Sequence, residues 1–210
     1  MNSMSNENKK RGRRYQLKAR AESERRTRER IVQATMELHK EVGPAKTTVA
    51  EIARRAEVTR LTVYNHFPED SALFGACQAH WMGLHPLPDL SVALLLPEPH
   101  ERVRAVLRGF YAWYRETAPM AEMVQRDRGA VPALDALMER TADTRLNQLS
   151  DALATGFDKG GRGVTRTLIR LALDFWTWRR LNLEGLDHDI AADLMTHAIA
   201  SVTTAKRRRR

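Results

Sequence analysis

Cysteine is almost absent from this chain of 210 residues, and so are long hydrophobic runs. The single cysteine, Cys77, cannot form an internal disulfide, which is typical of proteins in a reducing compartment. No window approaches the roughly 18 consecutive apolar residues of a membrane span. The polar, charged N-terminus also lacks the apolar segment of a signal peptide. We therefore expect a cytoplasmic protein with no membrane partner.

Catalytic and cofactor motifs are lacking as well. The seven histidines are scattered, no glycine pattern of a nucleotide-binding loop occurs, and no serine lies in a nucleophile elbow. Cys77 and His80 are spaced i, i+3, so a metal or thiol sensor has to be considered. However, Cys77 falls in an apolar stripe, where a lone cysteine is usually buried. The sequence therefore predicts no enzyme, no cofactor and no metal site, while leaving a sensor at these two residues open.

Positive charge is concentrated at the two ends of the chain. The sequence has 35 Lys+Arg and 26 Asp+Glu, a formal net charge of +9. Residues 1–30 carry +7 and residues 206–210 carry +5, so residues 31–205 are slightly acidic. Residues 1–21 are polar without apolar periodicity and are predicted to form a disordered basic arm, and residues 207–210 a basic tail. Such an arm could lie along DNA phosphates or enter a minor groove, or it could remain a solvated tail.

The chain is organised around residues 49–68, VAEIARRAEVTRLTVYNHFP, which predict two short helices joined by a tight turn. Small and apolar residues match the buried positions of a helix-turn-helix: Ile52, Ala53, Ala56, Val58, Val63 and Phe67. Thr59 is placed to cap the second helix. The alternative is a pair of ordinary amphipathic helices.

The outward face of the second helix argues against that alternative. It carries a guanidinium, hydroxyls, an amide and a phenol, which suit the base edges and phosphates of DNA. The candidate DNA-binding residues in and around this motif are Thr48, Thr59, Arg60, Leu61, Thr62, Tyr64, Asn65 and His66.

This stretch resembles the DNA-binding domain of the TetR family of bacterial transcriptional regulators. The resemblance is carried by Thr47-Thr48-Val49, Ile52-Ala53, Val58-Thr59 and Val63-Tyr64-Asn65-His66-Phe67-Pro68, and it extends from Arg28 to Phe74. It implies an all-helical homodimer with a C-terminal domain that binds a small molecule. It also implies that Arg60, Leu61 and Thr62 lie near base edges, with Tyr64, Asn65 and His66 along the groove wall and backbone.

Two positions depart from the pattern of the family. Members usually carry glycine in the turn, where this chain has Glu57, so Glu57 must tolerate any positive φ that the turn demands. Many members carry lysine three residues after the phenylalanine as a phosphate contact, where this chain has Asp70. A carboxylate at that position would repel a phosphate, or it could cap the following helix.

Residues 22–82 are predicted to form the DNA-binding domain with its connecting helix, and residues 83–206 a second, helical domain. Residues 83–99 hold four of the eight prolines, which mark the boundary. Apolar spacing predicts helices over 100–117, from 120 to near Gly129, and over 132–153, 165–183 and 187–202. Pro119 is expected to interrupt the first two, and Gly160 and Gly161 to lie in a flexible loop over 156–163.

The second domain is expected to bind a ligand and to form a dimer. Thioether and aromatic side chains that could line an apolar ligand pocket, or simply pack in the core, are Phe110, Trp113, Met120, Met123 and Trp176. The segment 165–183 is apolar on nearly every side, which predicts burial on both faces. Two such helices from each subunit could form a four-helix bundle, although a single-chain core is the alternative. The candidate dimerisation residues are Leu168, Phe175, Leu194, Ala198, Ile199 and Val202.

Together these observations predict an all-α fold, with an N-terminal three-helix DNA-binding domain and a C-terminal ligand-binding and dimerisation domain. The predicted function is a dimeric, sequence-specific regulator that binds a double-stranded DNA operator, most simply a repressor released by a small-molecule effector. A weakly specific architectural protein that coats DNA through its basic tails is the alternative.

Overall fold

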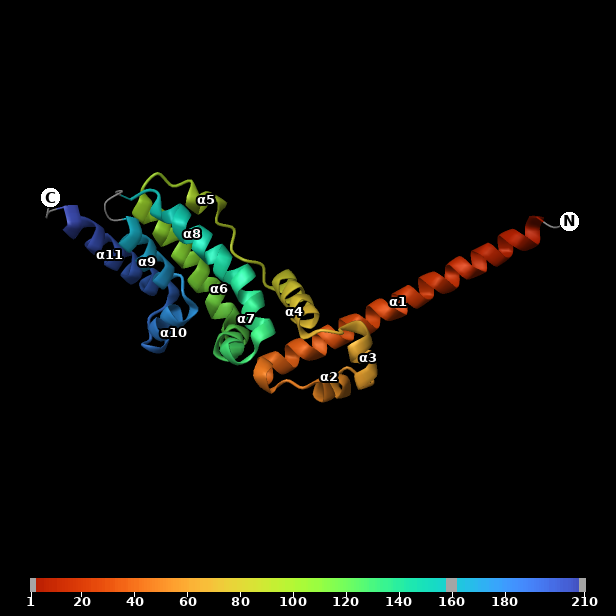
Figure 1. Ribbon diagram of the computed structural model, residues 1–210. Coiled ribbons are helices and arrows are strands. Elements are labelled where there is room, and N and C mark those ends of the chain that lie inside the picture. The colour runs from red at the N-terminus through yellow and green to blue at the C-terminus, as the bar shows by residue number, and fades with distance from the viewer. Residues whose placement is uncertain (1–2, 158–161, 208–210) are drawn as a thin grey trace. The chain divides into compact units, whose positions relative to one another are not determined.

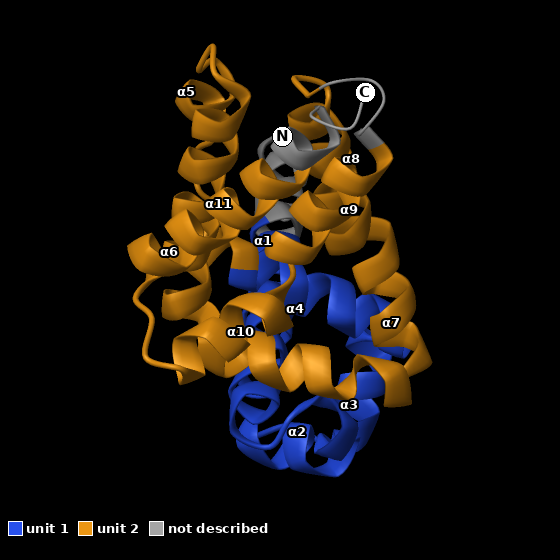
Figure 2. Cartoon of the chain, turned by 90° about the vertical axis from the view of Figure 1, so that its left-hand side faces the viewer, with its two compact units in different colours: residues 1–81 blue, residues 82–210 orange. Residues whose placement is uncertain are grey.

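The computed structural model describes the backbone of residues 3–157 and 162–207 and the side chains of residues 15–157 and 163–202 (Figure 1). Every regular element over the described backbone is a helix, which confirms the all-α prediction. The chain divides into two compact units, residues 1–81 and 82–210 (Figure 2). The division falls between residues 81 and 82, next to the proline-rich segment 83–99. Over the described residues, no helix is long and apolar enough to cross a membrane.

The first unit is built from four α-helices and a short 3₁₀ turn. These are α1 (Ser3–Glu41), η1 (Pro44–Lys46), α2 (Val49–Arg55), α3 (Arg60–His66) and α4 (Asp70–Leu84), whose end passes into the second unit. The core contains buried side chains from each helix, among them Ile31, Leu38, Ile52, Val63, Phe67 and Leu73. Burial of these side chains away from water fixes α3 against the helices around it.

The predicted disordered arm is wrong as far as the backbone is described, because α1 begins at Ser3 and continues without a break to Glu41. Residues 13–42 contain no glycine or proline and are rich in Arg, Glu and Ala, which favour helix. Ion pairs within one helical turn add support, with Arg20 to Glu24 at 3.1 Å and Arg26 to Glu22 at 3.0 Å. The packed half of α1 nucleates the helix, so the exposed half only has to extend it.

The second unit is a bundle of helices around a single apolar core. Its elements are α5 (Ser91–Leu94), α6 (Pro99–Asp127), η2 (Arg128–Ala130), α7 (Pro132–Met138), the π-helical turn η3 (Glu139–Asp143), α8 (Thr144–Ala154), α9 (Arg162–Ala172), α10 (Phe175–Leu183) and α11 (His188–Arg207). Side chains of α6, α9, α10 and α11 dominate the core, including Val106, Tyr111, Ile169, Phe175, Trp178 and Ile199. The predicted loop over 156–163 falls largely outside the described residues, as do residues 208–210 of the basic tail.

The predicted helix break at Pro119 is wrong, because α6 runs through Pro119 as one helix of 29 residues. A proline removes one N–H and frees the carbonyl four residues earlier. Both Pro119 and Arg115, which carries that carbonyl, lie on the exposed side of α6. Water can therefore satisfy the freed carbonyl, and the buried side of the helix keeps its packing.

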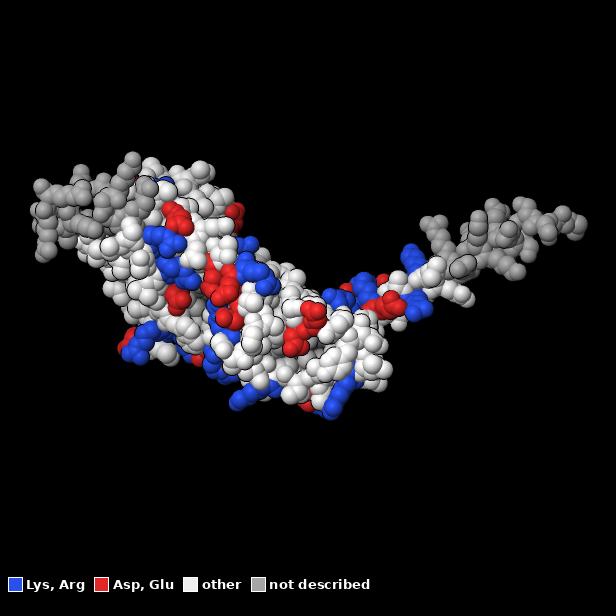
Figure 3. Space-filling view, viewed as in Figure 1, with Lys and Arg blue, Asp and Glu red and all other residues white. Residues whose placement is uncertain are grey.

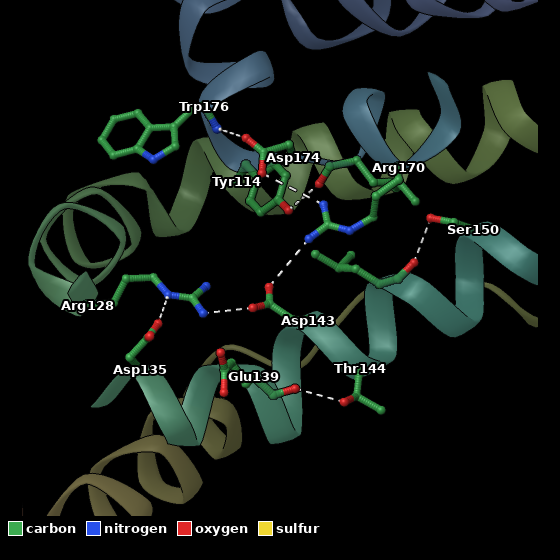
Figure 4. A network of polar contacts seen from close by, with 12 residues as sticks. Tyr114, Arg128, Asp135, Glu139, Asp143, Thr144, Ser150, Arg170, Asp174 and Trp176 are labelled. Carbon is green, nitrogen blue, oxygen red and sulfur yellow. Dashed lines mark hydrogen bonds and ion pairs between the residues drawn. The ribbon is translucent and has the colours of Figure 1, made fainter. Parts of the chain in front are cut away.

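The helix predicted over 132–153 is interrupted by the π-helical turn η3. The hydroxyl of Thr144 donates to the carbonyl of Glu139 at 2.8 Å, five residues back. Asp143, in this turn, accepts from Arg128 at 2.7 Å and from Arg170 of α9 at 3.4 Å (Figure 4). The ion pairs connect η2, η3 and α9, a long-range constraint that apolar periodicity does not reveal.

The single helix predicted over 165–183 is also wrong, because it consists of α9 and α10 with a break at Asp174. The Asp174 carboxylate accepts from the N–H of Trp176 at 2.8 Å and caps α10 (Figure 4). The phenol of Tyr111 donates to the carbonyl of Ala172 at 2.7 Å, and that of Tyr114 to the carbonyl of Leu173 at 2.8 Å. These two bonds satisfy carbonyls at the end of α9, so the break can be buried.

Candidate nucleic-acid interface

The turn between α2 and α3 contains a residue with positive φ. Glu57 has φ of 53°, which confirms the expectation that this position takes a conformation favoured by glycine. The N–H of Val58 donates to the carbonyl of Ala53 at 3.0 Å and closes the end of α2. The turn therefore has the backbone of a helix-turn-helix without its usual glycine.

Threonines cap both short helices. The N–H of Glu51 donates to the Thr48 hydroxyl at 3.2 Å, and the N–H of Thr62 donates to the Thr59 hydroxyl at 3.1 Å. The cap predicted for Thr59 is therefore confirmed. The hydroxyls of Thr59 and Thr62 also lie 2.8 Å apart and hydrogen bond to each other. Both hydroxyls therefore help to stabilise the N-terminal end of α3.

Three polar side chains on the outward face of α3 have no partner within the described part of the chain. Val63 and Phe67 are buried, whereas Leu61 is 68% and Tyr64 53% exposed. Arg60 and Asn65 are also exposed, while Thr62 and His66 are half-buried. Among the side chains described, those of Arg60, Tyr64 and Asn65 take part in no hydrogen bond or ion pair. A guanidinium, a phenol and an amide on one helix are therefore available to an outside ligand such as DNA.

Arg28 braces the end of α3, a role that sequence reasoning missed. Its Nη1 donates to the carbonyl of His66 at 2.9 Å, and its guanidinium carbon lies 4.0 Å from the centre of the Phe67 ring. The carbonyl belongs to the last turn of α3, where cations are favoured. Arg28 is 38 residues from His66 along the chain, so no local pattern connects the two residues.

Charges near the motif are largely paired. Arg55 donates to both carboxylate oxygens of Glu41 at 2.7 Å, which joins α2 to the end of α1. The Arg54 guanidinium lies beside Glu51. Hydrogen bonds from these arginines hold the pKa values of both glutamates below their usual range. On the face in Figure 3, Lys and Arg alternate with Asp and Glu over the coloured surface, with no continuous basic patch.

Asp70 is the first residue of α4 and is exposed. The backbone carbonyl of Glu69, the residue before it, accepts from the N–H groups of Ala72 and Leu73 at 3.1 and 3.4 Å. Asp70 therefore lies within the first helical turn, where a carboxylate interacts favourably with the helix dipole.

Cys77 and His80 do not form a common site. Cys77 is buried in the core of the first unit, and its burial raises the pKa of the thiol to about 12. His80 is exposed. Metal binding and thiol oxidation both need a thiolate, which this environment disfavours. Over the described residues there is no cluster of three or more His, Cys, Asp or Glu that could hold a metal ion.

The five residues proposed for a ligand pocket are not brought together on one open surface. Phe110 and Met120 are buried in the core, and Trp113 donates its indole N–H to the carbonyl of His85 at 3.2 Å. Met123 is half-buried, whereas Trp176 is 44% exposed. An open pocket of about 270 Å³ lies elsewhere, beside the turn from α10 to α11, and none of the five residues lines it.

The candidate dimerisation residues separate into two groups. Phe175 and Ile199 are buried in the core of their own subunit, so they do not lie on an exposed face. Leu168 is half-buried. The remaining residues are exposed on α11 at intervals of four and continue to Ile190, a set that we call the α11 stripe: Ile190, Leu194, Ala198 and Val202. The stripe is the apolar surface of α11 that an outside partner could cover.

Comparison with known proteins places the first unit in a family. The family described as "Bacterial regulatory proteins, tetR family" matches residues 31–77. An HTH-type transcriptional repressor of Mycobacterium tuberculosis is 31% identical over 118 residues, 52% of this chain and 58% of that protein. An HTH-type transcriptional regulator of Mycobacterium bovis matches to the same extent. The chain thus spans less than two thirds of the length of these curated relatives.

Two solved structures share the fold. A TetR-like transcriptional regulator from Rhodococcus sp. RHA1 has a TM-score of 0.57 at 20% identity, over 82% of this chain and 93% of that one. A TetR transcription regulator from Haloarcula marismortui has a TM-score of 0.56 at 16% identity, over 85% of this chain and 97% of that one. The two curated Mycobacterium relatives are named as transcriptional regulators, in agreement with the prediction that the chain is not an enzyme. With the helix-turn-helix formed by α2 and α3, the family match over residues 31–77 identifies this DNA-binding region as that of the tetR family of bacterial regulatory proteins.

Proposed function

We propose that this protein is a dimeric, sequence-specific DNA-binding transcriptional regulator, and that it is a repressor released from its operator by a small-molecule effector. The observation that carries the proposal is the free outward face of α3. Arg60, Tyr64 and Asn65 have no partners there among the side chains that the structure describes, while Val63 and Phe67 anchor the opposite face in the core. A rigid helix with unused donors is the element that reads a major groove.

Within this proposal, the side chains divide into those that specify the sequence and those that position the protein. Arg60 carries two parallel donors that can bind the O6 and N7 atoms of a guanine. Leu61 and Thr62 lie beside it on α3 and can contact neighbouring bases. Tyr64 and Thr48 are placed to hold phosphates, which position the protein without reading the sequence.

The same proposal places the dimer contact on the α11 stripe. Leu194 is 47% exposed and Val202 42% exposed, and α9, which carries the exposed Leu171, packs beside α11. Two such faces could pair around a twofold axis and form a bundle of helices from both subunits. A dimer would present its two copies of α3 to successive major grooves, about 34–36 Å apart.

Release by an effector requires a second arrangement in which the two copies of α3 no longer match these grooves. A ligand shifts the equilibrium toward that arrangement only by as much as its affinities for the two arrangements differ. The Mycobacterium tuberculosis relative is named a repressor, which supports this direction of regulation. Such a regulator would act in the cytoplasm.

A competitive electrophoretic-shift assay tests the proposal. The protein is bound to a fragment of its own promoter, and unlabelled promoter DNA is compared with unlabelled random DNA as competitor. A regulator should prefer its operator by about 10³-fold or more at physiological salt. An architectural protein that coats DNA through its basic ends would show equal competition by both DNAs, and that result would refute sequence-specific regulation.

A further inference from the structure

The open pocket of about 270 Å³ in the second unit lies where α10 ends and α11 begins, against one residue of α6. Its walls combine a guanidinium, an imidazole, an amide, an indole, a carboxylate and apolar surface. The lining residues are Arg115, Trp178, Asn182, Gly185, Leu186, Asp187 and His188. The volume is just below the range of pockets that hold drug-sized ligands, so it suits a small molecule.

A well-defined turn forms the floor of this pocket. Gly185 has φ of 83°, and its N–H donates to the carbonyl of Asn182 at 3.0 Å, which ends α10. Two residues later, the Asp187 carboxylate accepts from the N–H of Ile190 at 2.8 Å and caps α11. Both helix ends are thus fixed by hydrogen bonds, so the pocket is preformed.

Trp178 borders the pocket with an indole N–H that has no partner within residues 15–157 and 163–202. The residue is only 2% exposed, and its ring packs on Tyr114 and Phe175 with centroids 5.7 and 5.5 Å away. Among the residues described, nothing accepts a hydrogen bond from its N–H. The indole nitrogen is not fully buried, so solvent can reach it. Because this ring borders the pocket, we infer that the N–H is a donor open to a ligand there.

Arg115 supplies a positive charge that forms no ion pair within the described residues. Most other arginines of the second unit whose side chains are described form ion pairs with carboxylates: Arg104, Arg108, Arg126, Arg128, Arg166, Arg170, Arg179 and Arg180. Arg115 instead lies with its Nη1 3.1 Å from Nδ1 of His188. A guanidinium can only donate, so Nδ1 accepts from it. No carboxylate among the described side chains neutralises Arg115.

The carboxylate of Asp187 does not reverse the charge preference of the pocket. One of its oxygens already accepts the capping hydrogen bond, and its charge faces the positive end of the dipole of α11, a helix of 20 residues. Arg115, the Trp178 N–H and the Asn182 amide remain as donors. Leu186 and the Trp178 ring provide apolar surface for the body of a ligand.

From this arrangement we propose that the pocket between Arg115 and the α10–α11 turn binds a small organic carboxylate with a planar apolar body. The guanidinium binds the carboxylate, since the two groups match in charge and in geometry. The indole N–H and the Asn182 amide add donors, and the apolar wall covers the body. Carboxylate binding at this pocket does not depend on the proposed function. Only the further step, that the bound carboxylate is the effector that releases DNA, rests on that function.

The binding test uses benzoate as the probe, with its uncharged isostere benzamide for comparison. The chain has four tryptophans, so a ¹H–¹⁵N spectrum contains four indole N–H signals, and Trp178→Phe identifies that of Trp178. Benzoate should shift this signal in a saturable way and leave the signal of Trp113, already hydrogen bonded to His85, in place. Benzamide should bind about tenfold more weakly, because it lacks the charge that Arg115 recognises.

Variants locate the site without unfolding the protein. Arg115→Gln removes the charge at an exposed position and should weaken benzoate binding about tenfold or more. Arg145→Gln, at an exposed position on α8, is the matched control and should bind like the wild type. Equal binding of benzoate by wild type and Arg115→Gln would overturn the proposal. Failure of benzoate, phenylacetate and indole-3-acetate alike to shift the Trp178 signal would overturn it too.

The two proposals fail in different ways. If the promoter fragment is bound specifically but no carboxylate shifts the Trp178 signal, the site is wrong and the proposed function stands. If benzoate binds through Arg115 but the promoter fragment competes no better than random DNA, the site stands and the proposed function is wrong. Weaker promoter binding in the presence of benzoate, lost in Arg115→Gln, would identify this pocket as an effector site.

Discussion

The guanidinium of Arg28 in α1 lies over the ring of Phe67, 4.0 Å from its centre, at the residue that ends α3. The same side chain donates to the carbonyl of His66. A basic residue near the start of the predicted DNA-binding domain is therefore used to hold the candidate recognition helix. Its positive charge is directed inward at this helix end, where it also satisfies a backbone carbonyl.

Arg28→Ala should lower the free energy of unfolding by about 1 kcal/mol, because it removes a cation–π contact and a hydrogen bond at a helix end. Operator affinity should fall while the preferred sequence stays the same. Urea denaturation followed by circular dichroism measures the first effect. Arg26→Ala, which removes only a surface pair with Glu22, is the control and should change stability by less than about 0.5 kcal/mol. Equal effects of the two substitutions would show that the contact does not brace α3.

Glu57→Gly should stabilise the protein by about 1 kcal/mol, because Glu57 holds a positive φ that costs a residue with a Cβ but not glycine. Glu57→Ala keeps the Cβ and should give no such gain. Thermal unfolding of the two variants beside the wild type decides the matter. A glycine variant no more stable than the alanine variant would mean that the turn carries no strain at this residue.

Arg60→Ala should relax the preference at one base pair in each half-site, with a loss of about 1–3 kcal/mol of discrimination. Tyr64→Phe should instead lower affinity evenly across sequences, because a lost phosphate contact carries no sequence information. Both side chains are exposed, so neither change should unfold α3. Selection from a library of random operators tests both. The assignment is refuted if Arg60→Ala selects the wild-type sequence.

Asp70→Lys should tighten DNA binding and slightly lower thermal stability. The lysine replaces a carboxylate that would repel the DNA backbone, but it places a cation in the first turn of α4, at a cost of about 0.5 kcal/mol. Asp70→Asn removes the charge alone and should give an intermediate affinity. Fluorescence anisotropy with operator DNA over a range of salt concentrations is the measurement. Weaker binding by the lysine variant would place this residue away from DNA.

Leu194→Asp should dissociate the dimer and leave each subunit folded, because Leu194 is exposed in the α11 stripe and a partner would bury the new charge. Ile199→Asp should unfold the subunit instead, since Ile199 is fully buried in its own core. Sedimentation velocity together with circular dichroism separates the two outcomes. A wild type that sediments as a monomer at micromolar concentration would contradict the proposed interface.

Local chemistry determined what the sequence alone could predict. The helix-turn-helix was predictable because its signals lie within twenty residues: small residues at the helix crossing, Thr59 as a cap, and Val63 and Phe67 four residues apart. The positive φ of Glu57 could be expected because Glu57 occupies the turn position where related sequences usually carry glycine. Helical periodicity likewise predicted a helix over 187–202, where the structure has α11. Such signals persist in any surroundings, because neighbours along the chain create them.

Contacts between distant residues decided the rest. Pro119 did not end α6, because the residue whose carbonyl it frees lies on the exposed side of the helix. The chain could break at Asp174, because Tyr111 and Tyr114 satisfy the backbone carbonyls at the end of α9. The apolar residues of 165–183 gave no sign of which would be buried in their own subunit, since hydrophobicity is the same for a core and for an interface. Arg28 bracing α3 and the free indole N–H of Trp178 beside Arg115 likewise arise from residues far apart in the chain, which only folding brings together.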